Sequence, residues 1–193
     1  MVNETRSHLS GLSEADERTI GGPAKGTRGR GVTAAKHKSL VIGAVEVIAY
    51  ENNQGTCCER AGRLRLSTMD NAGAVNIRDF LARNVEAGST VRTEGGPGYS
   101  DEALVGDMHR VRVVHTPERA HQVAPHVHRV FSNLNAWLNG THHGVEPRYL
   151  QRYWDEFVFR FNRRNTPMAA FQTLLGISTQ KAPLPLRDLV VLS

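Results

Sequence analysis

Apolar residues in the first half of the chain follow the short runs and two-residue alternation that are typical of β-strands. The run LVIGAVEVIAY at residues 40–50 is almost continuously apolar, which predicts a strand buried on both faces. At residues 63–68, Leu64 and Leu66 alternate with arginines, which predicts a half-buried strand that forms a hairpin with the previous one. Comparable patterns predict three further strands, at residues 15–20, 89–95 and 108–115.

From Asn71 onward the apolar spacing changes to that of α-helices. The first helical face is formed by four apolar residues, with a glycine as the expected stop: Ile77, Phe80, Leu81, Val85 and then Gly88. The same spacing predicts helices over 127–138, ended by Gly140, over 149–161, with Pro147 in the first turn, and over 168–177. Within the 149–161 helix, Glu156 is placed to pair with Arg160 one turn later.

The order of these elements indicates a mixed α/β protein. A mixed sheet with helices packed against it accommodates strands, a helix, further strands and then several helices. The densest core is expected within residues 126–164, because this stretch holds eight of the twelve aromatic residues and aromatics bury the most apolar surface. A chain of 193 residues is long enough to form one domain with such a core.

Positive charge is concentrated in two parts of the chain. The net charge of +5 favours an anionic partner, and nucleic acid is the first to consider. Residues 23–38 contain no acidic residue and five lysines and arginines: Lys25, Arg28, Arg30, Lys36 and Lys38. Arg163 and Arg164 close the aromatic region. The basic, glycine-rich segment is therefore interpreted either as an arm that contacts phosphates or as a solvated loop.

The cysteines and the lack of a membrane-length apolar run restrict the protein class. No run approaches the roughly 20 apolar residues of a membrane span, and the N-terminus lacks a signal-peptide core, so we expect a cytoplasmic protein. Cys57 and Cys58 are the only cysteines, and they are adjacent. They are expected to be reduced and to lie in a loop within residues 51–62, because two neighbouring cysteines make neither a disulfide framework nor a four-ligand zinc site.

Histidines raise the alternative of a zinc hydrolase. The six that carry this alternative are His109, His115, His126, His128, His142 and His143. Their spacing does not match H-E-x-x-H or a comparable ligand motif. His142 and His143 are instead expected to pack the joint between two helices or to contact DNA.

Three oxygen-bearing side chains stand at positions where a sheet could bring them together. Asp16 lies on the first predicted strand, Glu94 lies at the end of the 89–95 strand, and Asn133 lies on the first helix of the aromatic region. Carboxylate and amide oxygens are the ligands that hard divalent cations prefer. Two such ions roughly 4 Å apart support phosphoryl transfer. The alternative interpretation is that each residue is a solvated surface group.

Several motifs resemble one family of mobile-element enzymes. The segments ADERTIGGPAKGTRGRG, LVIGAVEV, GSTVRTEGGPGY and HRVFSNLNAWLNGTHHGVEPRYLQRYWDEFVFRFNRR are similar to the catalytic domain of ISXO-type insertion-sequence transposases. The resemblance covers roughly residues 14–177, and its most specific part is 128–164. It implies a catalytic domain at 14–177. The polar, patternless residues 1–13 predict a flexible start, and the proline-punctuated residues 178–193 predict a tail.

The resemblance implies an RNase H-like fold with a DDE-type site in which many members use Asn third. On that pattern Asp16, Glu94 and Asn133 hold Mg²⁺ or Mn²⁺. The enzyme would cut transposon ends and join the freed 3′-hydroxyl to target DNA, by in-line displacement at phosphorus. Transposon-end and target DNA are the implied partners, no membrane is involved, a homodimer is a candidate assembly, and the protein would associate with the nucleoid.

Two departures from the family pattern bear on activity. Glu94 stands where the family usually has Asp, and its extra methylene moves a ligand oxygen by about an ångström, a displacement that can lower a catalytic rate roughly 10²-fold. Full-length relatives carry an N-terminal zinc ribbon, whereas this chain begins just before the first catalytic motif. These features predict a truncated or weakened copy, with a non-catalytic DNA-binding remnant as the alternative.

Overall fold

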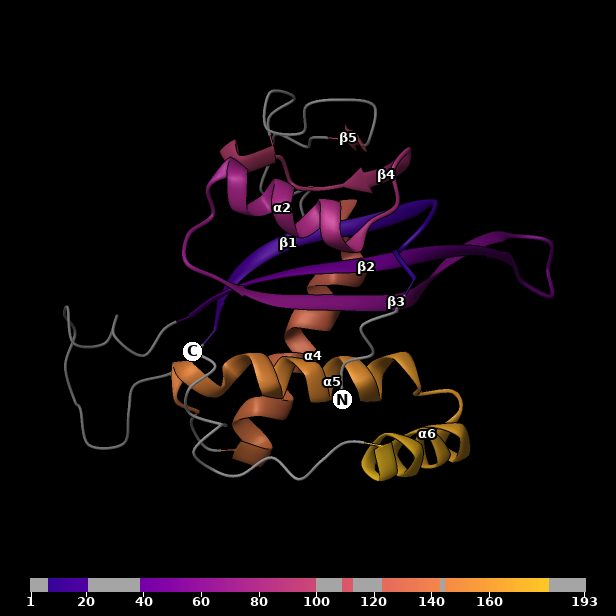
Figure 1. The fold of residues 1–193 in the computed structure, drawn as a ribbon. Helices are drawn as coiled ribbons and strands as arrows, with labels where there is room; N and C mark the ends of the chain where they lie inside the picture. Colours follow the sequence, from indigo (N-terminus) through magenta and orange to yellow (C-terminus); the bar gives the residue numbers. More distant parts are fainter. Residues whose placement is uncertain (1–6, 21–38, 100–108, 113–122, 143–144, 181–193) are drawn as a thin grey trace.

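The chain forms a five-stranded sheet with helices on both sides (Figure 1). The computed structural model describes residues 7–20, 39–99, 109–112, 123–142 and 145–180. The strands are β1 (Leu12–Ile20), β2 (Ser39–Glu51), β3 (Cys57–Met69), β4 (Ser89–Arg92) and β5 (His109–Arg112). The helices are α2 (Ala74–Asn84), α4 (Pro125–His142), α5 (Leu150–Asn162) and α6 (Pro167–Gln180), with short 3-10 turns at Pro97–Tyr99 and Pro147–Tyr149.

The sheet is mixed, as the order of predicted elements indicated. Its strand order is β3-β2-β1-β4-β5. β1, β2 and β3 are antiparallel neighbours, whereas β4 runs parallel to β1 and β5 runs parallel to β4. The mixed α/β class is confirmed, and a mixed sheet flanked by helices is compatible with the RNase H-like fold implied by the resemblance.

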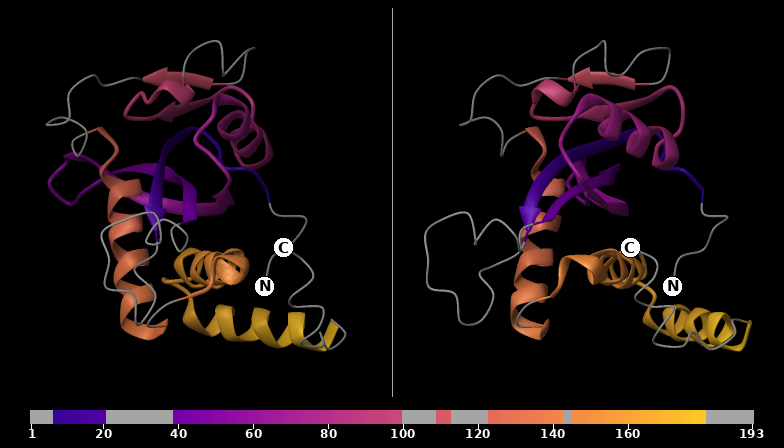
Figure 2. Two further views of the ribbon diagram at one scale, coloured as in Figure 1. Left: turned by 90° about the vertical axis from the view of Figure 1, so that its left-hand side faces the viewer. Right: turned by 60° about the vertical axis from the view of Figure 1, so that its left-hand side comes forward.

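Helices lie on both faces of the sheet (Figure 2), and each face has its own hydrophobic core. One face packs against α4 and α5 through a large cluster that includes Phe131, Leu134 and Trp154. The other face packs against α2 through a smaller cluster that includes Ile77 and Leu81. α6 lies beyond α5, outside these layers (Figures 1 and 2). The large cluster confirms that the densest packing lies in the aromatic region.

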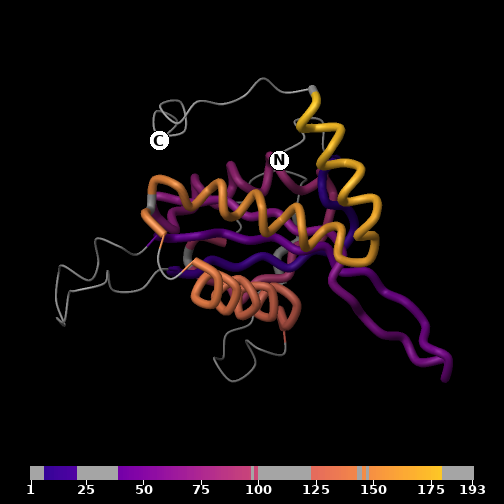
Figure 3. The backbone as a smooth tube through the Cα atoms, turned by 90° about the horizontal axis from the view of Figure 1, so that it is seen from below, coloured from indigo at the N-terminus to yellow at the C-terminus, as the bar shows by residue number. Residues whose placement is uncertain are grey.

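The hairpin of β2 and β3 is longer than the sequence pattern predicted. Both strands continue past the body of the domain, and their outer ends project from it (Figure 3). Cys57 and Cys58 are free, but they lie at the start of β3 rather than in a loop, so that part of the prediction was wrong. The pairing of Glu51 with Cys57 explains the difference, because cross-strand hydrogen bonding extends the ladder beyond the apolar residues.

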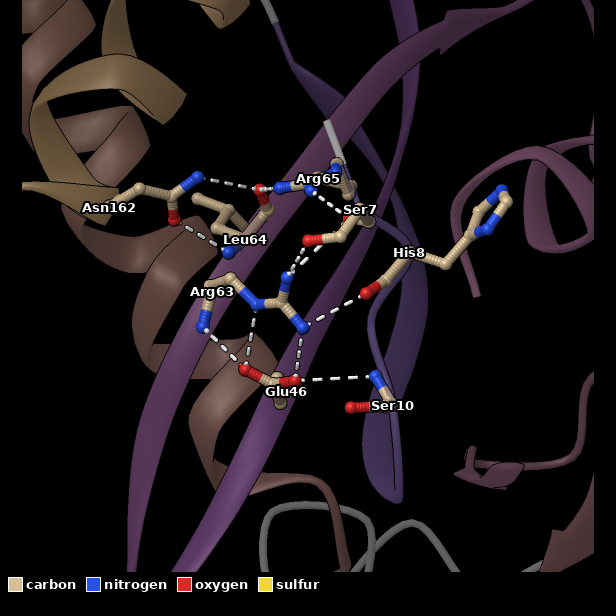
Figure 4. A network of polar contacts seen from close by, with 8 residues as sticks. All are labelled: Ser7, His8, Ser10, Glu46, Arg63, Leu64, Arg65 and Asn162. Carbon is tan, nitrogen blue, oxygen red and sulfur yellow. Dashed lines mark hydrogen bonds and ion pairs between the residues drawn. The ribbon is translucent and has the colours of Figure 1, made fainter. Parts of the chain in front are cut away.

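The start of the described chain is held on the sheet by a polar network (Figure 4). Arg63 pairs with Glu46 at 2.8 Å and donates hydrogen bonds to the Ser7 hydroxyl at 2.6 Å and the His8 carbonyl at 2.9 Å. Leu9 is fully buried and bridges to Val85. The expected flexible start therefore does not extend to residues 7–13.

This network also explains why Arg65 departs from the expected alternation on β3. Leu64 and Leu66 are buried as predicted, but Arg65 is only 4% exposed. Its guanidinium donates hydrogen bonds to the backbone carbonyls of Ser7 and Leu64. A buried arginine needs such acceptors, and the N-terminal segment supplies one of them.

Two predicted helix ends were wrong. α4 continues through Gly140 to His142, where the His142 ring packs edge-on against Trp137 with ring centroids 4.8 Å apart. This packing outweighs the roughly 1 kcal/mol that a glycine costs within a helix. α2 ends at Asn84, and Gly88, at φ +82°, forms the turn into β4 instead. The predicted pair of Glu156 and Arg160 is confirmed at 2.7 Å.

The helices in the described part of the chain include no candidate for a membrane-spanning segment. Each helix there is too short or too polar to cross a lipid bilayer.

Gly43 allows α4 to approach the sheet closely. A Cβ at this position would lie 2.9 Å from Leu66 Cδ2 and 3.1 Å from Phe131 Cζ, and both of those side chains are buried. Gly43 is also the cross-strand partner of Asp16. Its small size therefore allows α4 to lie close to β2, directly beside the strand that carries Asp16.

We predict that Gly43→Ala destabilises the fold by about 1–3 kcal/mol, because an added methyl overpacks this contact. Gly140→Ala is the matched control, since nothing lies within 4 Å of its Cβ position. That change should stabilise the helix by about 1 kcal/mol. Urea unfolding followed by circular dichroism measures both values. Equal effects of the two substitutions would contradict the close-approach role of Gly43.

Candidate metal centre

Three side chains from distant parts of the chain meet beside the sheet. Asp16 comes from β1, Glu94 follows β4 by two residues, and His128 comes from the end of the first turn of α4. One ligand atom from each lies within 4.8 Å of the others, and all three residues are partly buried. His128 Nε2 contacts Glu94 Oε1 directly and lies 3.9 Å from Asp16 Oδ2.

The parallel pairing of β1 and β4 brings the two carboxylates together. Glu14 on β1 is the direct partner of Arg92 on β4. Asp16 and Glu94 each lie two residues further along, so both carboxylates come from the same side of neighbouring chain segments. The sequence correctly anticipated this convergence of Asp16 with Glu94.

The N-terminus of α4 brings the third member of the cluster to the carboxylates. The Glu14 carboxylate accepts hydrogen bonds from the backbone N–H groups of His126 and Val127, at 2.6 and 2.9 Å. Its other oxygen lies 2.9 Å from His126 Nδ1. His128 follows within the same stretch of helix, so this contact places its ring near Asp16.

The cluster carries more negative charge than its surroundings readily accommodate. Burial, together with the nearby carboxylates of Glu17 and Glu94, raises the pKa of Asp16 to about 7. Tyr99 is buried close to the same acids, and burial together with Glu17 holds its pKa well above the ordinary value. Tyr99 therefore stays protonated at neutral pH and adds no further negative charge.

The donor set fits a divalent cation. Clustered, partly buried carboxylates with a raised pKa are stabilised in their ionised form by an opposite charge. Imidazole nitrogen is a better ligand for transition-metal ions than for Mg²⁺, which favours oxygen and retained water. Asp16, Glu94 and His128 therefore suit Mn²⁺ at least as well as Mg²⁺.

Asn133 lies on α4 but not on the same side as His128. Its side chain is exposed. Five residues separate the two positions, which corresponds to a rotation of about 140° around a helix with 3.6 residues per turn. The role of Asn133 as a third ligand therefore stays a prediction, while the ligand atoms that the structure gathers are those of Asp16, Glu94 and His128.

Comparison with known proteins assigns the family. Residues 8–162 match the ISXO2-like transposase domain, a span that contains the whole cluster. The chain belongs to the ISXO2-like transposases. No curated protein matches it significantly.

The DNA-contacting residues expected of this transposase domain are only partly described. Lys25, Arg28, Arg30, Lys36, Lys38 and His143 lie outside the described residues. His142 packs between Trp137 and Tyr153, with ring centroids at 4.8 and 4.6 Å. This agrees with the interpretation that His142 packs the joint between two helices, and it leaves DNA contact by this residue a prediction.

Arg163 and Arg164 stand at the end of α5 with their guanidinium groups stacked on rings. Each lies 4.2 Å from a phenylalanine centroid, over Phe159 and Phe161 respectively. Arg164 also donates hydrogen bonds to backbone carbonyls of β3. Burial, followed by the charge of Arg60, lowers the pKa of Arg164. The corner between α5 and β3 therefore gathers positive charge.

The site residue that sequence reasoning missed in the transposase domain is His128. Sequence spacing does not distinguish it from the other histidines, because none of them matches a zinc-ligand motif. A usable signal existed, since His128 follows Pro125 closely and Pro marks the first turn of a helix. Side chains from a first turn are near whatever carboxylate caps that helix.

We predict that Asp16→Asn stabilises the metal-free protein above pH 7. Because the folded-state pKa is raised from 3.8 to about 7, the folded state binds more protons than the unfolded state between these values. Stability is therefore present at low pH and is lost as pH rises through this window. Removing the charge should add on the order of 2–4 kcal/mol at pH 8 and almost nothing near pH 4.

Urea unfolding in EDTA at several pH values measures this difference. Asp79→Asn is the control, because Asp79 is 48% exposed on α2, with Arg78 3.8 Å away. It should show no comparable pH-dependent gain. A loss of stability in Asp16→Asn at pH 8 would contradict the charge repulsion described for the cluster.

Proposed function

We propose that the protein is an insertion-sequence transposase that cuts transposon ends and joins them to target DNA with the aid of divalent cations. The observation that carries this proposal is the meeting of Asp16, Glu94 and His128 inside a matched transposase domain. Carboxylate oxygens that converge from neighbouring segments can hold the divalent ions that support DNA phosphoryl transfer.

Asp16 and Glu94 would hold the cation through their carboxylate oxygens, and His128 would add Nε2. When bound, divalent ions activate the attacking oxygen and stabilise the leaving oxygen during in-line displacement. The contact between His128 and Glu94 orients the longer side chain of Glu94 before any ion is present. This orientation supports a working site despite the extra methylene that distinguishes Glu94 from the usual Asp.

The identity of the third ligand separates two versions of the proposal. His128 is supported by its place in the cluster. Asn133 is supported by the resemblance to family members that use Asn third. The two versions differ in metal preference, because an imidazole ligand favours Mn²⁺ over Mg²⁺, whereas an amide oxygen suits either ion.

DNA binding is proposed at the corner between α5 and β3. Arg60 and Arg164 are close enough for the charge of one to lower the pKa of the other. A phosphate backbone would relieve this repulsion, and such contacts give affinity without sequence choice. The basic segment at 25–38 and His143 stay predicted contacts, as do the homodimer and nucleoid association.

A non-catalytic DNA-binding remnant is the second candidate. Glu94 favours it, because a displaced carboxylate can lower the rate roughly 10²-fold. The two candidates differ in chemistry but not in DNA binding, so a cleavage assay separates them.

The experiment uses a labelled duplex that carries the terminal inverted repeat from the flanking genomic DNA, with Mg²⁺ or Mn²⁺. We predict cleavage by the wild type that is stronger in Mn²⁺, a gain of up to about 10²-fold in Glu94→Asp, and loss in Asp16→Ala. His128→Ala should remove most of the Mn²⁺-supported activity, and Asn133→Ala tests the family pattern.

Cleavage that survives Asp16→Ala would contradict the metal-site assignment. Duplex binding without cleavage in the wild type and in Glu94→Asp would favour the non-catalytic remnant. Equal activity of His128→Ala and wild type, with loss in Asn133→Ala, would identify Asn133 as the third ligand.

A further inference from the structure

The metal-site cluster has a second layer of charged and polar side chains beneath it, centred on the fully buried Glu14. On each of the three segments, a second charged or polar residue precedes the member of the metal-site cluster by two positions. These residues are Glu14 before Asp16, Arg92 before Glu94, and His126 before His128. Glu14 contacts both of the others, at 2.9 Å from His126 Nδ1 and 3.7 Å from Arg92 Nη2. We propose that Glu14, with His126 and Arg92, is a positioning residue that sets the place of His128 in the metal site.

This inference rests on the proposed metal site, but its structural basis is independent of any ion. Glu14 is 0% exposed, so its carboxylate has no water to solvate it. A buried charge is stable only when it is paired and hydrogen-bonded. Glu14 meets this requirement through the backbone of α4, the His126 ring and Arg92.

The N-terminus of α4 has no capping side chain of its own. Ala124 precedes the helix, and Pro125 opens it. An alanine side chain accepts no hydrogen bond, and proline has no N–H, so the next free donors belong to His126 and Val127. These are the two N–H groups that Glu14 satisfies. A carboxylate on β1 therefore performs the capping that a local Ser, Thr, Asp or Asn usually performs.

Capping from a strand fixes where the helix begins relative to the sheet. The positive end of the helix dipole attracts the carboxylate, and the two N–H bonds define the rotation of the first turn. The backbone N–H of His128 then donates to the Ala124 carbonyl at 3.3 Å. Because Glu14 and Asp16 lie on one strand, the same segment holds the helix and presents the carboxylate that His128 approaches.

The lower layer itself is better explained as an ion-pair network than as a second metal site. Ligand atoms of Glu14, Glu59 and His126 lie within 4.8 Å of one another. Arg92 already supplies the positive charge there, since its guanidinium lies 2.7 Å from Glu59 Oε2 and faces Glu14. The two layers thus differ in charge balance: Arg92 compensates the lower one, while the upper one has the raised pKa of Asp16.

The test compares Glu14→Gln with Glu59→Gln. Both remove one negative charge from the Arg92 network, but Glu14 is the one hydrogen-bonded to the backbone of α4. We expect Glu14→Gln to weaken Mn²⁺ binding about tenfold, the lower end of effects seen for groups that orient metal ligands. Glu59→Gln should stay within twofold of wild type. The free Mn²⁺ signal in electron paramagnetic resonance titrations gives both affinities.

A second readout needs no metal. The ring signals of His128, assigned with His128→Asn, are recorded by two-bond ¹H–¹⁵N NMR in EDTA. Glu14→Gln should shift or broaden them, whereas Glu59→Gln should not. Leu81→Ala controls for lost stability, because Leu81 is fully buried on the opposite face of the sheet. It should unfold more easily while leaving the ring signals and the Mn²⁺ affinity unchanged.

The Mn²⁺ affinities and the ring signals together decide whether Glu14 positions His128. Wild-type Mn²⁺ affinity and unchanged ring signals in Glu14→Gln would overturn it, as would equal weakening in Leu81→Ala. If the wild type binds no Mn²⁺, the proposed metal site fails, and the ring signals alone decide whether Glu14 positions His128. If Glu14→Gln does not fold, His126→Gln replaces it. This variant keeps both backbone bonds of Glu14, and unchanged ring signals in it would count against the proposal.

Discussion

The Glu14 carboxylate lies buried between β1 and the N-terminus of α4, where it accepts two backbone hydrogen bonds and contacts His126 and Arg92. Most of the site geometry depends on this contact. α4 supplies a large part of the core on its face of the sheet, and its first turns carry His128. Without a carboxylate at this point, two helix donors would be buried unsatisfied, which costs roughly 1–3 kcal/mol for each group.

The two layers of polar groups divide structural and chemical roles between them. Below, Glu14 and Arg92 compensate each other and leave little reason to bind an ion. Above, burial and neighbouring acids raise the pKa of Asp16 to about 7, so the ionised site gains stability from a cation. Two-residue spacing on β1 places one carboxylate in each layer, because alternate residues of a strand face the same side.

Much of the fold could be predicted from the periodicity of apolar residues. Leu64 and Leu66 on β3 and Ile77 on α2 recur at strand and helix spacing because such positions face the core, and all three are buried. The site was predictable only where backbone pairing decides it, as for Asp16 beside the end of β4. His128 depends on a contact between β1 and the backbone of α4, which side-chain spacing does not encode. The extension of α4 past Gly140 to His142 could not be predicted for the same reason. It depends on packing between the rings of His142 and Trp137, which side-chain spacing does not encode.

We propose that Asp16, Glu94 and His128 form one cation site. Anomalous diffraction at the manganese edge from crystals soaked in Mn²⁺ locates the ion. We expect a peak within about 2–2.5 Å of a carboxylate oxygen of Asp16, a carboxylate oxygen of Glu94 and His128 Nε2, as in other oxygen and nitrogen ligand sets. A peak between Glu14, Glu59 and His126, or one that Asn133 ligates while His128 points away, would contradict it.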